Sequence, residues 1–297
     1  MDFHQYIRAV GTGPKSNREL ETEEVIDCMK QILNQDAKSE QIAAFLLGWR
    51  VNIETNKELV TALSVFEDYI KKVNIPNSIE LGYPYDGKAD NPYLFPLFGK
   101  YLKKFDLSIV LSGDYLQPAK NGITVKDVAT NIALDDNIHF FDRKDYFKEL
   151  SDLTEVRNTL GLRTVFNTLE KLSNPANSQF AITSAFHKPY VNKYNEIFGP
   201  NYKHFAVVQG NEGTPEIFSK CKYWLKENGK INEYHIEPEY YGITYKKSWK
   251  RITLEESINE TNNPSAELEK LAKLNVALLL VTAQKAKSIK DAFEMLS

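Results

Sequence analysis

Leu160-Gly161-Leu162-Arg163-Thr164-Val165-Phe166-Asn167 is the most informative stretch of this chain, and Ser173-Asn174-Pro175-Ala176 closes it. The apolar residues around Arg163 predict a short buried helix with the arginine presented at its start. Asn174 and Pro175 predict the end of that helix, because proline cannot continue it. The arginine matters because its fork of N–H donors matches two oxygens of a carboxylate or a phosphate.

Arg163 and Asn167 are therefore candidate ligand-binding residues. Arg157, earlier in the same stretch, could supply a second positive charge. The alternative reading of Arg163 is a buried side chain that ties a helical part to a sheet part by hydrogen bonds. The two roles are compatible.

The composition gives no general attraction to nucleic acid or to an anionic membrane. The 297 residues include 37 Lys and Arg against 40 Asp and Glu, a formal net charge of −3. Binding to either partner would need a local basic face. Cys28 and Cys221 have no paired Cys or His nearby, which indicates neither disulfides nor a zinc site and suits a reducing cytoplasm. With no signal-peptide layout and no membrane-length apolar stretch, we expect a cytoplasmic protein that does not enter the membrane.

The first part of the chain reads as helices. Apolar residues recur at helical spacing within 23–33, 40–50 and 57–73, and again within 155–172. Pro76 interrupts this pattern and marks a boundary.

Beyond Pro76 the pattern changes to an α/β one. Short apolar runs at 108–111 and 205–208 alternate with amphipathic segments at 93–105 and 188–198, which predicts strands alternating with helices. Residues 222–250 alternate tyrosine with charge and predict an antiparallel or irregular excursion. A final helix is predicted over 266–280, continuing to 296.

Four segments, in chain order, resemble the anthranilate phosphoribosyltransferase family of nucleoside phosphorylase-type glycosyltransferases (glycosyltransferase family 3). They are residues 39–47, 160–175, 210–217 and 274–278. The opening through Gly13 and the altered loops described below are more similar to a paralogous branch. Its members keep a dimeric fold, have lost the biosynthetic activity and include nucleic-acid binders.

The resemblance implies an α/β fold with a small all-helical domain and a larger α/β domain, whose central, mostly parallel sheet is flanked by helices. It assigns residues 1–73 to the helical domain, completed by about 150–176. Residues 77–149 and 177–297 then form the α/β domain, with the ligand cleft at the hinge. It also implies a homodimer through the helical domains.

The phosphate-binding loop of that family is altered in this chain. The family has Gly-Thr-Gly-Gly-Asp, whose backbone donors approach the pyrophosphate of phosphoribosyl pyrophosphate. Here Gly82 is followed by Tyr83-Pro84-Tyr85, and then by Asp86 and Gly87-Lys88. Proline removes a donor and the tyrosines add bulk, so pyrophosphate would bind in an altered way. Gly82, Gly87 and Lys88 remain candidate ligand contacts at the expected end of a strand.

Two further family sites are partly kept. Where the family has Lys-His-Gly-Asn, this chain keeps Gly113 beside Ser112 and Asp114, which can also be read as an ordinary strand-to-helix turn. Where the family holds magnesium with an Asp-Glu pair, Glu216 matches the second acid and Pro215 replaces the first. The resemblance therefore implies a weakened magnesium site at Glu216, which Glu212 could partly complete.

Two stretches mix cations with aromatic rings, a combination that suits single-stranded nucleic acid. One lies within 100–105. The other contains Lys246, Lys247, Trp249, Lys250 and Arg251. The alternative reading of each is a solvated surface.

We interpret the chain as an anthranilate phosphoribosyltransferase-like protein that no longer transfers phosphoribose to anthranilate. It would bind a phosphate-bearing ligand, with nucleic acid as one candidate, through Arg163, Lys88 and the 246–251 stretch. The alternative is an active phosphoribosyltransferase acting on an aromatic or heterocyclic acceptor, with Arg163 on the acceptor, the 82–87 loop on pyrophosphate and Glu216 on magnesium. A third reading is a structural partner protein.

Overall fold

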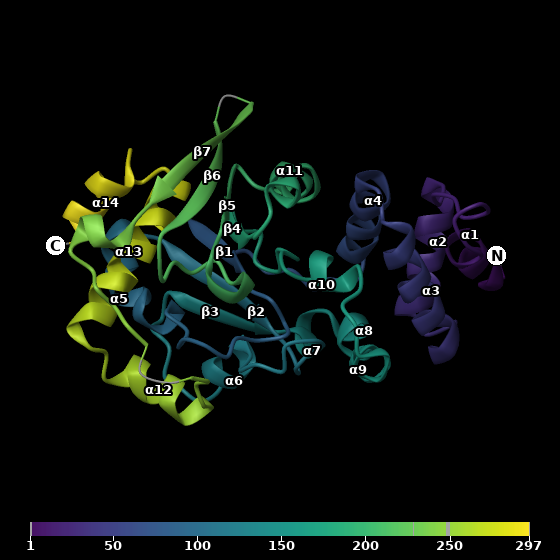
Figure 1. Cartoon of the computed structure of the whole chain (residues 1–297), viewed down its shortest axis with the longest axis horizontal. Coiled ribbons are helices and arrows are strands. Elements are labelled where there is room, and N and C mark those ends of the chain that lie inside the picture. The colour runs from purple at the N-terminus through teal and green to yellow at the C-terminus, as the bar shows by residue number, and fades with distance from the viewer. Residues whose placement is uncertain (1, 228, 248–249, 297) are drawn as a thin grey trace.

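A computed structural model describes residues 2–227, 229–247 and 250–296. A helical part and an α/β part lie end to end along the long axis of the molecule (Figure 1). Among the described residues, none of the helices combines the length and the apolar character needed to cross a bilayer.

The N-terminal part consists of four helices, and three of them correspond to the predicted periodic segments, although α4 ends at Glu67 and not at the predicted residue 73. Glu21 and Glu24 form a reciprocal capping box at the start of α2, and Thr55 and Glu58 do the same at α4. Trp49 on α3 is fully buried among the apolar faces of these helices. The bounds are α1 (His4–Gly11), α2 (Thr22–Leu33), α3 (Ser39–Asn52) and α4 (Asn56–Glu67).

The α/β part is built on a seven-stranded sheet with strand order β3-β2-β1-β4-β5-β6-β7. Strands β1 to β5 are parallel, and the hairpin β6–β7 adds two antiparallel strands at one edge. The predicted fold class is therefore confirmed. Of the excursion predicted over 222–250, the part up to Ile236 is antiparallel. The bounds are β1 (Ser78–Gly82), β2 (Ser108–Gly113), β3 (Ile138–Asp142), β4 (Phe180–Ser184), β5 (His204–Val208), β6 (Cys221–Glu227) and β7 (Lys230–Ile236).

Both faces of the central strands are buried, which explains why these strands read as short continuous apolar runs. Ile182 and Val208 face one hydrophobic cluster, with α13, whereas the neighbouring residues Ala181 and Val207 face the other, which continues into the N-terminal helices. The helices beside the first cluster are α5 (Gly99–Leu102), α6 (Val125–Ala129), α12 (Leu254–Asn262), α13 (Ala266–Thr282) and α14 (Ile289–Met295).

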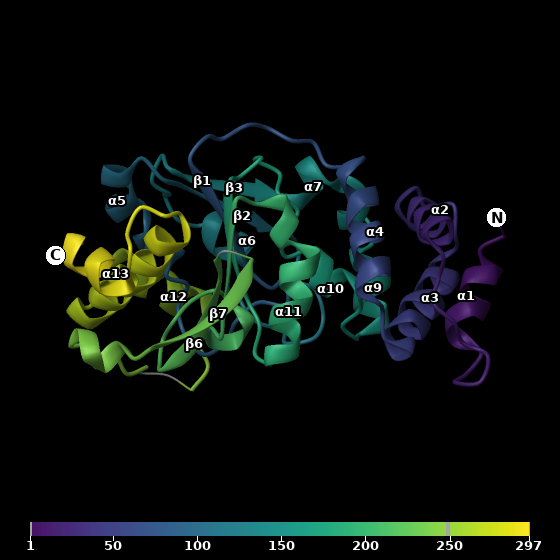
Figure 2. The ribbon, with the colours of Figure 1, turned by 90° about the horizontal axis from the view of Figure 1, so that it is seen from above.

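The remaining helices lie between the sheet and the N-terminal part. In both ribbon views α10 and α11 stand between the strands and α4 (Figures 1 and 2). This region contains the segment predicted to complete the helical domain, and the exact domain boundaries stay a prediction. The bounds are α7 (Arg143–Tyr146), α8 (Lys148–Ser151), α9 (Thr154–Leu160), α10 (Phe166–Leu169) and α11 (Lys188–Ile197).

Besides the helix predicted over 57–73, three predicted helices are shorter or more broken than expected. Gly161 adopts a left-handed φ of 68° that ends α9, so residues 161–165 form a connection and the helix predicted over 155–172 is split. Pro96 lies in a 3₁₀ turn, and the segment 93–105 alternates 3₁₀ turns with the short α5. The helix predicted over 266–280 with a continuation to 296 forms two helices, because α13 ends at Thr282 and α14 is separate.

Candidate functional site

A cleft of about 730 Å³ opens at the carboxyl ends of β1, β4 and β5. The loops after these three strands form one wall, because parallel strands end at the same edge of a sheet. The opposite wall comes from the connection before α10, the residues around α10 and Arg50 of α3. The cleft therefore lies where the sheet meets the helical part.

Arg163 and the loop after β1 meet in this cleft. The Arg163 guanidinium donates from Nε to Asp86 Oδ2 at 3.0 Å and makes a second, shorter contact from Nη2. Asp86 is almost completely buried, whereas about half of the Arg163 side chain is exposed. The arginine is thus anchored by an internal carboxylate and still faces the cleft.

Asn167 also lines the cleft, and its side chain orients the connection that carries Arg163. Its Oδ1 accepts from the Thr164 backbone N–H at 2.9 Å, and its Nδ2 donates to the Pro118 carbonyl at 2.9 Å. Arg163 and Asn167 are therefore placed together, as the motif predicts. Their role in ligand binding stays a prediction.

Two lysines that sequence reasoning did not select complete a cationic cluster around Asp86. Lys120 Nζ lies 3.6 Å from Asp86 Oδ1, and burial lowers the pKa of Lys120 while Asp86 acts against that shift. Lys171 donates to the Ser184 carbonyl at 3.2 Å, and burial lowers its pKa to about 8, again opposed by Asp86. The i,i+4 spacing from Asn167 to Lys171 was a usable signal, whereas Lys120 has no local pattern that marks it.

Gly82 and Gly87 lie outside the lining of the cleft and have packing reasons to be glycine. A Cβ on Gly82 would stand 2.7 Å from Thr183 Oγ1. Gly87 has a φ of 74°, and a Cβ there would stand 2.5 Å from the Gly122 carbonyl carbon. The backbone after Gly87 is paired, because Lys88 N donates to Ile123 O at 3.0 Å. Ligand contacts at these two glycines stay a prediction, with no added support.

Lys88 is buried and does not face the cleft, so its expected role as a ligand contact gains no support and stays a prediction. Both it and Glu216 are fully buried, and Lys88 Nζ lies 2.5 Å from Glu216 Oε2. The other carboxylate oxygen accepts from the Tyr83 hydroxyl at 2.8 Å and from the Leu94 N–H at 2.7 Å. Tyr83 therefore points into the interior, and its ring does not add the expected bulk to the cleft.

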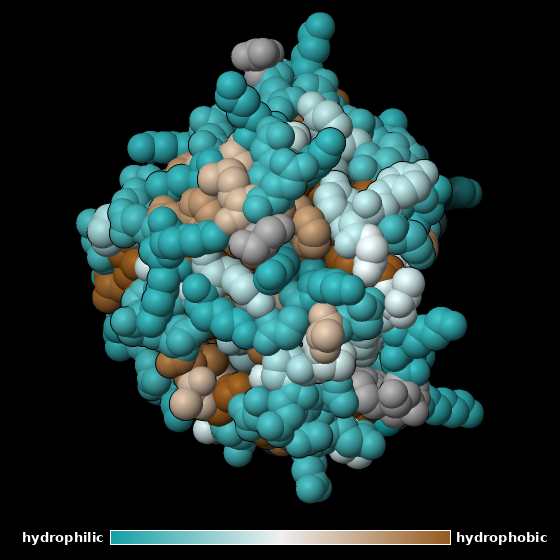
Figure 3. Space-filling model, turned by 90° about the vertical axis from the view of Figure 1, so that its left-hand side faces the viewer, coloured by the Kyte–Doolittle hydropathy of each residue, from teal (hydrophilic) through white to brown (hydrophobic). Residues whose placement is uncertain are grey.

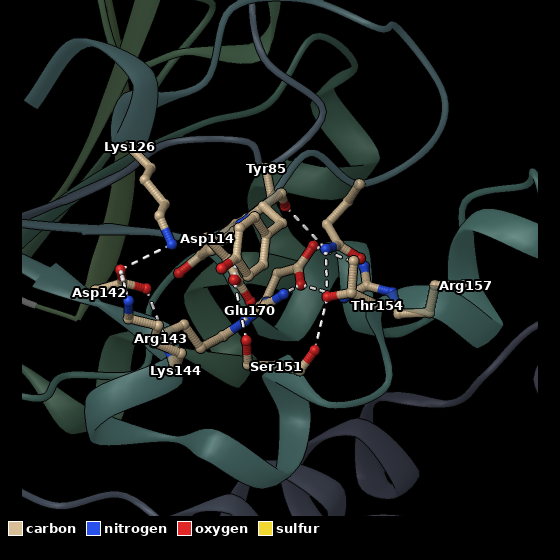
Figure 4. A network of polar contacts seen from close by, with 12 residues as sticks. Tyr85, Asp114, Lys126, Asp142, Arg143, Lys144, Ser151, Thr154, Arg157 and Glu170 are labelled. Carbon is tan, nitrogen blue, oxygen red and sulfur yellow. Dashed lines mark hydrogen bonds and ion pairs between the residues drawn. The ribbon is translucent and has the colours of Figure 1, made fainter. Parts of the chain in front are cut away.

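Arg157 and Asp114 belong to a buried network that also corrects the sequence interpretation (Figure 4). Arg157 donates two hydrogen bonds to the Glu170 carboxylate, at 2.6 and 2.8 Å. Arg143 contacts the same carboxylate and also lies 2.5 Å from Asp114. Burial opposes ionisation of Glu170, but Arg157 and Arg143 hold its pKa below the usual value. Arg157 thus supplies no charge to a ligand. Its hydrogen bonds instead hold segments of the protein together, as the alternative interpretation of Arg163 had it.

Gly113 ends β2 immediately before this network. A Cβ there would stand 2.8 Å from the Phe140 ring, so the residue is fixed by packing. Asp114 turns inward, where Ser151 Oγ donates to it at 3.0 Å. The alternative interpretation, an ordinary turn after a strand, therefore accounts for both Gly113 and Asp114. Because Asp114 is turned inward, it does not repel a phosphate in the cleft.

The basic-aromatic stretches lie apart from the lining of the cleft. Lys246, Lys247, Lys250 and Arg251 are exposed, and Trp249 lies outside the described residues. Lys247 pairs with Asp90 at 3.3 Å. In the 100–105 stretch, Lys100 pairs with Glu269 and Lys103 with Asp136. This 100–105 stretch is therefore largely neutralised by nearby acids.

Comparison with known proteins identifies both parts of the chain. Residues 112–297 match the family described as the glycosyl transferase family, a/b domain. Residues 4–69 match its helical bundle domain. The chain belongs to this glycosyl transferase family.

Anthranilate phosphoribosyltransferases are among the relatives of this family member. The enzyme of Neisseria meningitidis serogroup C, strain FAM18, is 30% identical over 302 residues, covering 93% of this chain and 86% of the relative. An uncharacterised protein of Aquifex aeolicus is 29% identical over 235 residues, covering 77% of this chain and 75% of that protein.

Solved structures of the same kind share the fold. Anthranilate phosphoribosyltransferase from Thermus thermophilus superposes with a TM-score of 0.79 at 19% identity, covering 100% of this chain and 93% of that one. The Saccharomyces cerevisiae enzyme, in complex with PRPP and Mg, gives a TM-score of 0.79 at 14% identity, with 99% and 92% coverage. At these identities the likeness shows the fold alone.

The magnesium that the resemblance implies does not fit the acids of this family member. Each oxygen of Glu216 already has a protein partner, and Pro215 cannot coordinate through its side chain. The Glu212 carboxylate accepts from the Ala89 and Asp90 N–H groups, at 2.6 and 3.0 Å. Across the described part of the chain, no group of three or more His, Cys, Asp or Glu side chains is arranged to hold a metal ion.

Proposed function

We propose that this glycosyl transferase family member binds a phosphate-bearing ligand in the cleft and does not transfer phosphoribose to anthranilate. The observation that carries the proposal is the arrangement of Arg163, Lys120 and Lys171 around one buried carboxylate, Asp86. Three cationic side chains facing one acid leave excess positive charge for a ligand anion. Ammonium and guanidinium groups bind phosphate through charge-assisted hydrogen bonds.

The shape of the cleft supports a ligand that also carries a planar ring. Its volume lies within the usual range of small-molecule sites. Phe186 and Tyr190 line the same cleft and are 70% and 40% exposed. An exposed aromatic face next to bound phosphate suits a nucleotide, either free or as part of a single strand. Nucleic acid is therefore included in the proposal.

The binding test uses titration calorimetry with adenosine 5′-monophosphate and with a single-stranded oligonucleotide. We expect Arg163→Ala and Lys171→Ala each to weaken binding at least about tenfold, since a charge-assisted hydrogen bond is lost. Oligonucleotide affinity should also fall steeply with salt, because phosphate contacts release counterions. Lys226→Ala, which removes an exposed cation from β6, is the charge-matched control.

Two results would contradict the proposal. One is equal loss of binding in the Lys226 and Lys171 variants. The other is turnover of anthranilate with phosphoribosyl pyrophosphate and magnesium by the wild-type protein, which would instead support the active transferase.

We also propose that the protein forms a homodimer through its helical part. Leu47, Val51, Ile53 and Val60 are exposed on α3, α4 and their connection, and Val51 and Ile53 are 70% and 75% exposed. In contrast, the end of the molecule formed by α13 and α14 is covered mostly by hydrophilic residues, with small apolar areas between them (Figure 3). The apolar helical surface is the better candidate for association.

Light scattering after gel filtration tests the dimer. We expect Val51→Glu to convert a wild-type dimer into a monomer, because a charge would be placed in the interface. Val73→Glu is the control, since Val73 is also half exposed but lies outside α3 and α4. A monomeric wild type, or a Val51 variant that stays dimeric, would contradict the proposal.

A further inference from the structure

Beside the cleft, Lys88 occupies a buried site built for a cation. Its ammonium lies 2.5 Å from Glu216 Oε2 and donates to the Pro92 carbonyl at 2.8 Å. The rings of Tyr93 and Phe218 lie 4.9 and 4.6 Å from it, measured to their centroids. Carboxylate and carbonyl oxygens are the donors that a hard divalent cation uses, and here an internal ammonium takes them.

The neighbouring loop holds a matching internal anion. Both oxygens of the Glu212 carboxylate accept from successive backbone N–H groups, those of Ala89 and Asp90. Successive N–H groups of this kind form anion-binding concavities that suit phosphate oxygens. Glu212 reaches them from a left-handed turn, with φ of 53°, and Lys120 donates to its carbonyl. The loop thus directs a carboxylate onto donors that a ligand would otherwise use.

From these two contacts we infer that the protein carries an internal substitute for a metal–diphosphate complex. The Lys88 ammonium replaces the cation at Glu216, and the Glu212 carboxylate replaces the anion on the 89–90 amides. The protein therefore binds no divalent cation at Glu216, and the adjoining cleft takes a single phosphate group without metal. The second statement rests on the proposed function; the first does not.

Electron paramagnetic resonance with manganese(II), a substitute for magnesium, tests the cation part on the wild-type protein. We expect no stoichiometric binding up to millimolar concentrations. One tightly bound manganese ion per chain would overturn the inference. Because no phosphate ligand is needed, this result is independent of whether the proposed function holds.

Lys88→Ala tests whether the ammonium stands in a cation's place. The variant leaves the Glu216 carboxylate and the Pro92 carbonyl facing an emptied space. We expect manganese to bind at one ion per chain and to raise its Tm, with no such effect in wild type. Lys100→Ala is the control, since it removes an equally close partner from Glu269, whose side chain is only partly buried. A soluble Lys88 variant that gains no metal binding would overturn the inference, and if it does not fold the wild-type measurement decides.

Two affinity measurements test the anion part. Adenosine monophosphate should bind wild type equally well with EDTA and with magnesium, and a loss of about tenfold or more in EDTA would overturn the inference.

Glu212→Ala should raise the affinity for inorganic diphosphate at least about tenfold, because it vacates the 89–90 amides. Glu255→Ala, an exposed acid on α12, is the charge-matched control. An equal gain in both variants, or no gain, would overturn it. Absent monophosphate binding in wild type would contradict the proposed function and leave the manganese result as the test of the cation site.

Discussion

At the scale of single residues, Lys171 sets the expected pH response of the cleft. Burial lowers its pKa to about 8, with Asp86 opposing the shift. In the ligand-free protein, the folded Lys171 loses its proton near pH 8, whereas the unfolded lysine keeps its proton to about pH 10.4. Its contribution to the free energy of unfolding is therefore unfavourable below about pH 8 and rises between these two pH values. A bound phosphate stabilises the charged form, so affinity must change in the opposite direction.

We accordingly predict that phosphate-ester affinity falls as pH rises through about 8, by at most about tenfold per unit for one lost proton. Lys171→Arg should keep the affinity and flatten this part of the profile, since arginine stays charged. Calorimetry across neutral and alkaline pH measures both. The comparison distinguishes Lys171 from Lys120, because burial lowers the pKa of Lys120 as well. Identical profiles in wild type and variant would show that Lys171 does not contact the ligand.

At the scale of elements, the buried network fixes how four segments meet behind the cleft. Asp114 follows β2, Arg143 begins α7, Arg157 lies on α9 and Glu170 directly follows α10 (Figure 4). Glu170 is the shared partner, because both guanidiniums contact its carboxylate. Its orientation therefore fixes the segment that carries Arg163 and Lys171 into the cleft.

Glu170→Gln should lower the free energy of unfolding by about 3–5 kcal/mol, because two buried guanidiniums lose their shared counter-charge. Denaturant unfolding gives this value. Asp152→Asn removes the partner of Lys148 nearby, where both side chains are exposed, and should change stability little. Similar losses in the two variants would mean that the buried network contributes no more than a surface ion pair.

At the scale of the whole molecule, one hydrophobic cluster runs from the N-terminal helices to the sheet. It includes Trp49 of α3, Phe66 of α4 and Val207 of β5. The Phe66 ring lies 5.0 Å from that of Phe147 and 5.9 Å from that of Phe166, between centroids. The helical and α/β parts therefore share buried surface.

Phe66→Ala should lower the free energy of unfolding by about 3–5 kcal/mol and shift one common transition. Calorimetry and tryptophan fluorescence are the measurements, and they should report the same midpoint because the shared core couples the parts. Two separate transitions, of which the mutation moves one, would show that the parts unfold independently.

Local sequence determined the elements and the position of the principal basic residue. Helical periodicity predicted α2, α3 and the span of α4 up to Glu67, and short apolar runs predicted β2 and β5, because these signals act between near neighbours along the chain. The 160–176 motif likewise predicted Arg163 and Asn167 together. The break at Gly161 was missed, since one left-handed residue interrupts a periodicity that otherwise continues on both sides.

The pairing of charges was decided by the tertiary structure. Lys88 was expected to face a ligand and is bound by Glu216, while Arg157 is bound by Glu170 and Glu212 by the backbone of another loop. Sequence shows which charges exist, but a buried charge must find its partner among residues that only folding brings within contact distance. The chain alone therefore determined the fold and the cationic motif. The three-dimensional arrangement determined which cations are neutralised internally and which remain for a ligand.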